Sequence, residues 1–155
     1  MPTPTVGKKI TAFDVATTSS PKLTNKDLAG RPYVLYFYPK DDTPGCTLES
    51  QGFRDEHAKF AKLKVRVIGV SRDTLASHAK FQGKYALPFE LAADGDETLC
   101  RQFDVIKEKN MYGKKVLGIE RSTFLVDADG VLRKQWRKVK VDGHVAEVLA
   151  AATEL

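Results

Sequence analysis

Cysteine and histidine are scarce in this sequence, and their scarcity removes two classes of protein. There are two cysteines in 155 residues, Cys46 and Cys100, far apart and without a C-x-x-C pair. A scaffold stapled by several disulfides is therefore excluded. The three histidines are scattered and form no metal-ligand spacing with each other or with a cysteine, so no metal site is predicted.

Long apolar runs are missing as well. No stretch approaches the roughly 20 apolar residues of a membrane-spanning helix. The first ten residues, Met1 to Ile10, lack the apolar core of a signal peptide. We therefore expect a cytoplasmic protein that does not associate with a membrane.

Basic residues are in excess but are not concentrated. Lys and Arg number 25 against 20 Asp and Glu, which gives a formal net charge of +5. The densest basic stretch is Arg133 to Lys140, where Leu132 and Trp136 can face inward while the lysines are solvated. This pattern is typical of a surface strand, and we expect no nucleic-acid partner.

Buried strands and amphipathic helices alternate along the chain. The run Tyr33 to Tyr38 is continuously apolar and lies between two prolines, which is typical of a central strand. Cys46, Phe53 and Phe60 recur every seven residues, so a helix from Gly45 to Leu63 would place them on one face. The other predicted elements are a helical turn at Leu23–Leu28, strands at Val65–Val70, Phe89–Leu91, Ser122–Val126 and Val131–Trp136, a helix from Asp73–Thr74 to Tyr85, a helix from Asp94 or Asp96 to Phe103, and a helix at Asp142–Ala152.

This order of elements predicts an α/β fold with a central mixed β-sheet flanked by helices. It is the order of a thioredoxin-like domain with inserted segments. No linker divides the chain, and its length suits a single core. We expect one domain over residues 1–155.

The candidate reactive residue follows the first predicted buried strand, at the start of the next helix. Cys46 would lie in the first helical turn, where backbone N–H groups lack internal partners and favour a thiolate. That dipole is worth roughly 0.3–1 kcal/mol, too little to ionise a free thiol, whose pKa is about 8.5, at neutral pH. A thiolate here needs a neighbouring arginine or lysine. The Thr43 hydroxyl, three residues earlier, could reach the sulfur.

The same segment resembles a known family. Residues Pro39 to Cys46 match the P-x-x-x-T-x-x-C motif of peroxiredoxins. The longer run Tyr36 to Thr47 is similar to the bacterioferritin-comigratory-protein branch, also called PrxQ, and the resemblance continues through Gly118 to Asp127. It covers nearly the whole chain and departs most at Gly7 to Val15, where a usual proline is absent.

The resemblance implies a role for each of five residues. Cys46 matches the peroxidatic cysteine, and Thr43 matches the hydroxyl that orients the peroxide. Pro39 matches the proline that shields the thiolate from water. Arg121 matches the arginine that pairs with the thiolate and the peroxide, which would supply the required cation. Glu49 matches an acidic position that braces Arg121, although a glutamate in a first helical turn is also explained by the helix dipole alone.

The implied activity is a thiol-dependent peroxidase acting on hydrogen peroxide and organic hydroperoxides. The Cys46 thiolate would attack the O–O bond and become a sulfenic acid, with no metal or organic cofactor. An external thiol, such as thioredoxin, glutaredoxin or glutathione, would then reduce the sulfenic acid. The branch is often monomeric, and we expect a monomer.

The cysteine that resolves the sulfenic acid in many relatives is absent from its two usual places. These places hold Gln51 and, on the next helix, Phe81 and Gln82. A one-cysteine cycle is therefore favoured. The alternative is an intramolecular disulfide between Cys46 and Cys100, which requires their Cα atoms to come within about 7 Å.

Two other functions fit the same fold. A disulfide oxidoreductase would need a second cysteine at position 43, where Thr43 stands. A binding module without catalytic activity is not excluded by the sequence, but the retention of Thr43, Cys46 and Arg121 argues against it.

Overall fold

The structure is a computed structural model that describes residues 3–155. No helix in this range is long and apolar enough to cross a membrane. The elements are β1 (Asp14–Thr17), β2 (Leu23–Thr24), β3 (Tyr33–Phe37), α1 (Pro44–Asp55), α2 (His57–Lys62), β4 (Arg66–Ser71), α3 (Leu75–Lys84), β5 (Glu90–Ala93), α4 (Thr98–Gln102), β6 (Ile106–Met111), β7 (Lys114–Ile119), β8 (Ser122–Val126), β9 (Leu132–Trp136) and α5 (His144–Thr153).

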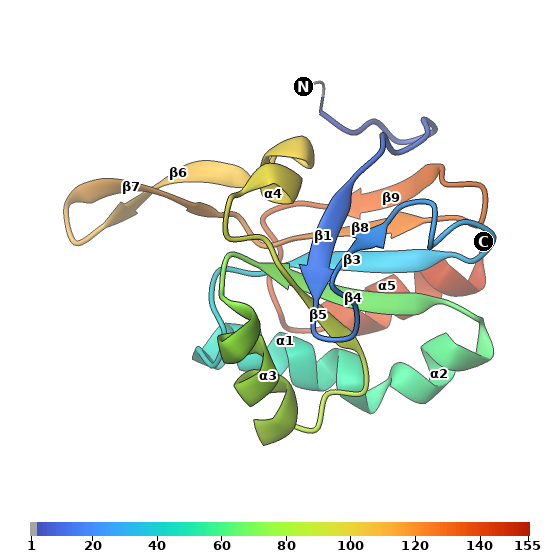
Figure 1. Cartoon of the computed structure of the whole chain (residues 1–155), viewed down its shortest axis with the longest axis horizontal. Helices are drawn as coiled ribbons and strands as arrows, with labels where there is room; N and C mark the ends of the chain where they lie inside the picture. The colour runs from blue at the N-terminus through green and yellow to red at the C-terminus, as the bar shows by residue number, and fades with distance from the viewer. Residues whose placement is uncertain (1–2) are drawn as a thin grey trace.

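A mixed sheet of seven strands forms the centre, in the order β2-β1-β5-β4-β3-β8-β9. β3, β4 and β5 are parallel, β8 runs antiparallel to β3, and β9 runs antiparallel to β8. α4 lies above the sheet in Figure 1, and α1, α2 and α3 lie below it. The predicted thioredoxin-like α/β fold, with helices on both faces of a mixed sheet, is confirmed.

β3 is buried at every position, and its side chains alternate between two cores. Leu35 and Phe37 pack with α4 and the N-terminal segment on one face. Val34 and Tyr36 pack with α1, α2, α3 and α5 on the other. Gly69 of β4 makes room for Tyr36, because a Cβ at Gly69 would lie 2.7 Å from the Tyr36 hydroxyl.

The single helix predicted from Gly45 to Leu63 is wrong, because the structure breaks it into α1 and α2 at Glu56. The backbone of Glu56 leaves helical geometry at φ −98° and ψ 3°. Phe53 and Phe60 still enter the same core as Cys46, as their spacing predicts. Because of this bend, α2 stays packed against the sheet beyond the end of α1.

The helical turn predicted at Leu23–Leu28 is also partly wrong. Leu23 and Thr24 form β2, which pairs with β1, and the turn occupies only the residues after them. The Asp27 carboxylate accepts hydrogen bonds from the Thr24 N–H at 2.9 Å and its hydroxyl at 3.0 Å. This local bonding replaces helical bonding and fixes the turn before Gly30, which has φ 90°.

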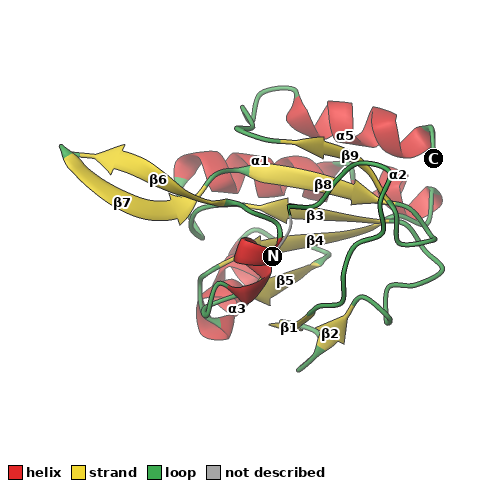
Figure 2. Ribbon diagram, turned by 90° about the horizontal axis from the view of Figure 1, so that it is seen from above, coloured by secondary structure: helices red, strands yellow, loops and turns green. Residues whose placement is uncertain are grey.

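The hairpin of β6 and β7 was not predicted from the sequence, nor was β1. The hairpin projects from the body of the molecule in both views (Figures 1 and 2). Its tight turn at Tyr112 and Gly113 has positive φ at both residues, 54° and 78°. Such values are typical of two-residue hairpin turns.

Candidate active site

The backbone places Cys46 just beyond the C-terminal end of β3, in the first turn of α1. β3 ends at Phe37, and Pro44 begins α1 after a short loop, with Thr43 at the N-cap in extended conformation. Proline is favoured at this position because its missing N–H has no partner in the helix anyway. The Cys46 side chain is 1% exposed and points into the core shared with Phe53.

Arg121 reaches Cys46 because of strand register. β8 is the antiparallel neighbour of β3, and Phe37 pairs with Ser122, so the start of β8 lies beside the end of β3. Arg121 Nη2 lies 3.3 Å from Cys46 Sγ. A Cβ at position 45 would lie 3.2 Å from that same nitrogen, so Gly45 leaves the guanidinium its space.

Glu49 completes a buried triad with these two residues. Arg121 Nη1 donates to Glu49 Oε1 at 2.7 Å, and the Glu49 side chain has no exposed surface. Burial raises the pKa of Glu49 to about 7, although the Arg121 guanidinium opposes the rise. Burial alone would lower the pKa of Arg121, but Glu49 and Cys46 more than offset this and raise it. The guanidinium is therefore charged at any physiological pH.

Thr43 and Pro39 lie in the loop that leads to α1. The Thr43 hydroxyl donates to the Lys40 carbonyl at 2.8 Å, and among the described contacts no hydrogen bond joins it to Cys46. With its proton engaged, the hydroxyl oxygen is left as an acceptor for a peroxide O–H. Pro39 is half-buried and has no N–H of its own. The catalytic roles of both residues stay predictions.

The loop is tied to α3 by contacts that sequence reasoning missed. Asp41 is buried and accepts from the Tyr38 hydroxyl at 2.6 Å and the Ser77 hydroxyl at 2.8 Å, and it lies 2.7 Å from His78 Nδ1. Asp42 bonds the far end of the same helix, at Lys84 Nζ, 2.8 Å away. These bonds fix the path of the loop that carries Thr43 to Cys46. The sequence signal was two adjacent aspartates in a loop, which by themselves indicate only a turn.

One group in the described part of the chain has the ligand types and spacing of a metal site, namely Asp41, Asp73 and His78. Their polar atoms already bond within the protein. His78 Nε2 lies 2.9 Å from the Ala92 carbonyl, and Asp73 Oδ2 accepts from the Ser71 hydroxyl at 2.5 Å. This network accounts for the group without a metal.

Cys100 lies on the opposite face of the sheet from Cys46. It packs with Leu99 and Phe103 in the core beneath α4, whereas Cys46 belongs to the core beneath α1. Burial and the neighbouring Asp94 carboxylate raise the pKa of Cys100 well above its ordinary value. Both cysteines are free thiols in the structure.

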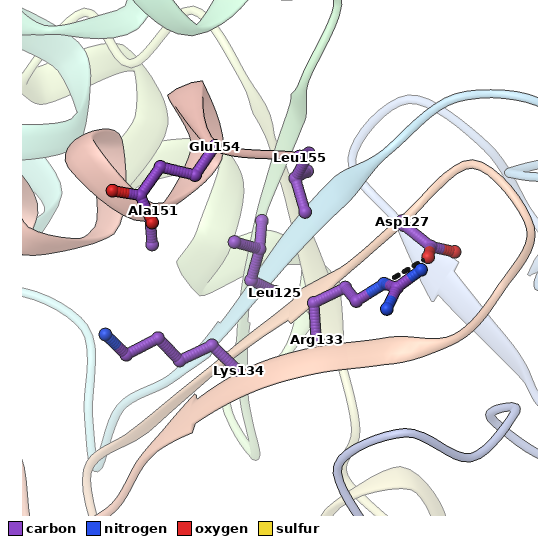
Figure 3. Close-up of a pocket in the computed structure, with 7 residues that line it drawn as sticks. All are labelled: Leu125, Asp127, Arg133, Lys134, Ala151, Glu154 and Leu155. Carbon is purple, nitrogen blue, oxygen red and sulfur yellow. Dashed lines mark hydrogen bonds and ion pairs between the residues drawn. The ribbon is translucent and has the colours of Figure 1, made fainter.

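A separate pocket lies between β8, β9 and the end of α5 (Figure 3). Its lining includes Leu125, Lys134 and Glu154, and Arg133 is bonded there to Asp127. None of the six candidate site residues lines it. The pocket is therefore separate from the residues around Cys46.

Comparison with known proteins gives one consistent picture. The model of the AhpC/TSA family matches residues 6–135. The putative peroxiredoxin bcp of Coxiella burnetii is 51% identical over 144 residues, which is 93% of this chain and 95% of that protein. A structure of the Xanthomonas campestris bacterioferritin comigratory protein is similar with a TM-score of 0.87 and 50% identity, over 92% of this chain and 90% of that one. The structure of a cysteine-to-serine mutant of Xylella fastidiosa PrxQ gives a TM-score of 0.92 at 39% identity, over 99% and 98%.

Proposed function

Because this chain belongs to the AhpC/TSA family and is a thiol-dependent peroxidase of the peroxiredoxin type, we propose that its reaction is carried by Cys46. The observation behind this assignment is the guanidinium of Arg121 held 3.3 Å from a buried sulfur. A cation at that distance favours the thiolate, which is the nucleophilic form of cysteine.

In the proposed step, the Cys46 thiolate attacks one oxygen of the hydroperoxide in line with the O–O bond. The S–O bond forms, the O–O bond breaks, and the second oxygen leaves with the electron pair and takes up a proton as water or alcohol. Arg121 and the free N–H groups of the first turn of α1 stabilise the negative charge that develops on the two oxygens. The Thr43 oxygen accepts the peroxide O–H and so orients the substrate.

Two further residues support this centre. Pro39 limits access of water to the sulfur from the loop side, and its position between β3 and α1 suits that role. Glu49 holds Arg121 through the bond between Oε1 and Nη1, which fixes one arm of the guanidinium while the other faces Cys46.

The cycle uses one cysteine, and an external thiol reduces the sulfenic acid. The sheet separates Cys100 from Cys46, so a disulfide between them would require the core under α4 or α1 to open. Gln51 in α1, and Phe81 and Gln82 in α3, supply no thiol nearer to the site. The reductant is thioredoxin, glutaredoxin or glutathione.

Hydrogen peroxide and organic hydroperoxides are the proposed substrates. The similar protein of Xanthomonas campestris is described for its alkyl peroxide reduction activity, which supports an organic hydroperoxide here. We also propose that the protein works as a monomer in the cytoplasm, which gel filtration and cell fractionation test directly.

The deciding experiment treats the reduced protein and its Cys46→Ser and Cys100→Ser variants with one equivalent of peroxide. Intact mass and a sulfenic-acid trap then report the product. We expect a trapped sulfenic acid at Cys46 in the wild type and in Cys100→Ser, and no peroxide consumption by Cys46→Ser. A rapid decrease in mass by two hydrogens, with a disulfide between Cys46 and Cys100, would overturn the one-cysteine cycle. Undiminished turnover by Cys46→Ser would overturn the assignment of the nucleophile.

A further inference from the structure

At the centre of the site one cation faces two groups that can each carry a negative charge. Arg121 donates through Nη2 to the Cys46 sulfur at 3.3 Å and through Nη1 to Glu49 Oε1 at 2.7 Å. The Arg121 side chain is 16% exposed and that of Glu49 is not exposed at all. If both Cys46 and Glu49 were ionised, the buried triad would hold an excess negative charge, which is costly away from water.

The second carboxyl oxygen of Glu49 lacks a neighbour that would stabilise a negative charge on it. Oε2 has no hydrogen-bond partner among the residues that the structure describes. His144 Nε2 of α5 lies 4.0 Å away and is instead bonded to the Thr123 hydroxyl at 2.8 Å. Burial lowers the pKa of His144 to about 4, with a contribution from Arg121, so this imidazole is neutral near neutral pH.

The remaining titratable groups around the triad do not supply a second cation to Glu49. Tyr36 of β3 is wholly buried, and burial raises its pKa well above the ordinary value, so its hydroxyl is neutral. Burial and the charge of Arg121 lower the pKa of Lys109 on β6, and no ion pair between Lys109 and Glu49 occurs within residues 3–155. Arg121 is thus the ion-pair partner that both potential anions share.

We propose that the Cys46 thiolate and the Glu49 carboxylate compete for the charge of Arg121, so that Glu49 holds a proton in the reduced enzyme and releases it when Cys46 is oxidised. This inference rests on the proposed function of Cys46. When the S–O bond forms and the O–O bond breaks, the leaving oxygen takes up one proton and the sulfur becomes an uncharged sulfenic acid. Arg121 then pairs with Glu49 alone, whose carboxyl group releases one proton to solvent, so proton uptake and release balance.

Proton counting tests this directly, because a residue that only braced Arg121 would leave the count unchanged. Reduced wild type, Glu49→Gln and Glu56→Gln react with less than one equivalent of hydrogen peroxide in weak buffer with a pH indicator. The pH is set just above the value of about 7 to which burial raises the pKa of Glu49 when Arg121 is its partner, so that only a competing thiolate keeps the carboxyl group protonated. Thiolate absorbance is recorded in the same samples, so that uptake is expressed per thiolate consumed. Glu56→Gln is the matched control, since Glu56 pairs with Lys59 two helical turns beyond Glu49.

We expect Glu49→Gln to take up one proton per thiolate oxidised, and the wild type and Glu56→Gln to take up far less. Uptake of one proton by the wild type would overturn the proposal. If the wild type did not react with peroxide at all, the function assigned to Cys46 would fail instead, so the two failures are distinguishable.

Infrared difference spectra provide a second readout that does not depend on the variant's rate. On oxidation the wild type should lose the C=O stretch of a protonated carboxyl group, and Glu49→Gln should show no such loss. In reduced Cys46→Ser at the same pH, no thiolate competes and the stretch should be weaker than in the wild type. A wild-type spectrum without this loss, or the same loss in Glu49→Gln, would contradict the proposal.

Discussion

Two buried cysteines in this protein occupy the same kind of place and have opposite surroundings. Cys46 is the third residue of α1 and Cys100 is the third residue of α4. Their side chains are 1% and 0% exposed. Burial and position in a helix therefore do not distinguish the cysteine that we propose to react with peroxide from the other one.

The charge beside each sulfur separates them. Arg121 Nη2 lies 3.3 Å from Cys46 Sγ. At Cys100 the neighbour is Asp94, whose Oδ2 accepts from the Cys100 N–H at 2.6 Å. That carboxylate adds to burial in raising the pKa of Cys100. The sheet thus has a sulfur beside a guanidinium on one face and a sulfur beside a carboxylate on the other.

Removal of the Arg121 guanidinium should have the largest effect on the reactivity of Cys46. We expect Arg121→Met to slow the oxidation of Cys46 by roughly 100- to 1000-fold, the loss typical of one donor to a developing oxyanion. Arg121→Lys should fall between, because it keeps the charge but loses the fork that serves Cys46 and Glu49 together. The second-order rate constant with hydrogen peroxide measures both.

Arg133→Met is the control for this series. Arg133 is an exposed arginine paired with Asp127 in the pocket of Figure 3, away from the site. Its removal should leave the rate of Cys46 oxidation within about twofold of the wild type, because an exposed charge away from the site is screened by salt. An equal loss in both variants would mean that net charge, and not the contact with Cys46, sets the rate.

The position of Cys46 could be predicted from sequence because it depends on local features. A continuous apolar run fixes the strand Tyr33–Phe37, and a proline with a glycine marks the start of the helix after it. A pairing cation was required by the weakness of a helix dipole alone. Arg121 was then chosen through the family resemblance, since strand register between β3 and β8 cannot be read from one sequence.

The features that could not be predicted depend on contacts distant in sequence or lack any periodicity. The bonds from Asp41 to Ser77 and His78 span more than thirty residues, and they form only once the loop meets α3. The β6–β7 hairpin exposes most of its side chains, with Lys114, Lys115 and Val116 in one exposed run. Such a strand shows no alternation of apolar and polar residues, so its pattern predicted nothing.

Each cysteine also has a buried carboxyl group nearby, and a substitution at Glu49 tests how the two carboxyl groups differ. Asp94 accepts two backbone N–H groups, whereas Glu49 has one partner. The pKa of Glu49 is raised from 4.5 to about 7, so its contribution to stability is complete below about 4.5 and is lost as pH rises through about 7. Glu49→Gln lacks this loss and should gain on the order of 3 kcal/mol relative to the wild type across that interval.

Urea unfolding of the reduced proteins over this pH range measures the difference. Ser50→Ala is the matched control, because Ser50 is the neighbouring buried residue, bonded to the Tyr36 hydroxyl at 2.9 Å, and does not titrate. Its difference from the wild type should be the same at each pH. A difference for Glu49→Gln that also stayed constant would show that Glu49 is ionised throughout the range.

The smallest effect is expected beside Cys100, which the proposed one-cysteine cycle does not use. Asp94 Oδ1 and Oδ2 accept from the N–H groups of Leu99 and Cys100 at 3.0 and 2.6 Å, which satisfies two donors at the start of α4. Asp94→Ala should lower the free energy of unfolding by roughly 1–2 kcal/mol in urea, against a few tenths for Asp129→Ala in an exposed turn. The rate of Cys46 oxidation should not change, because the sheet separates the two sites. A slower reaction in Asp94→Ala would show that the two faces are coupled, and that Cys100 and its surroundings belong to the working site after all.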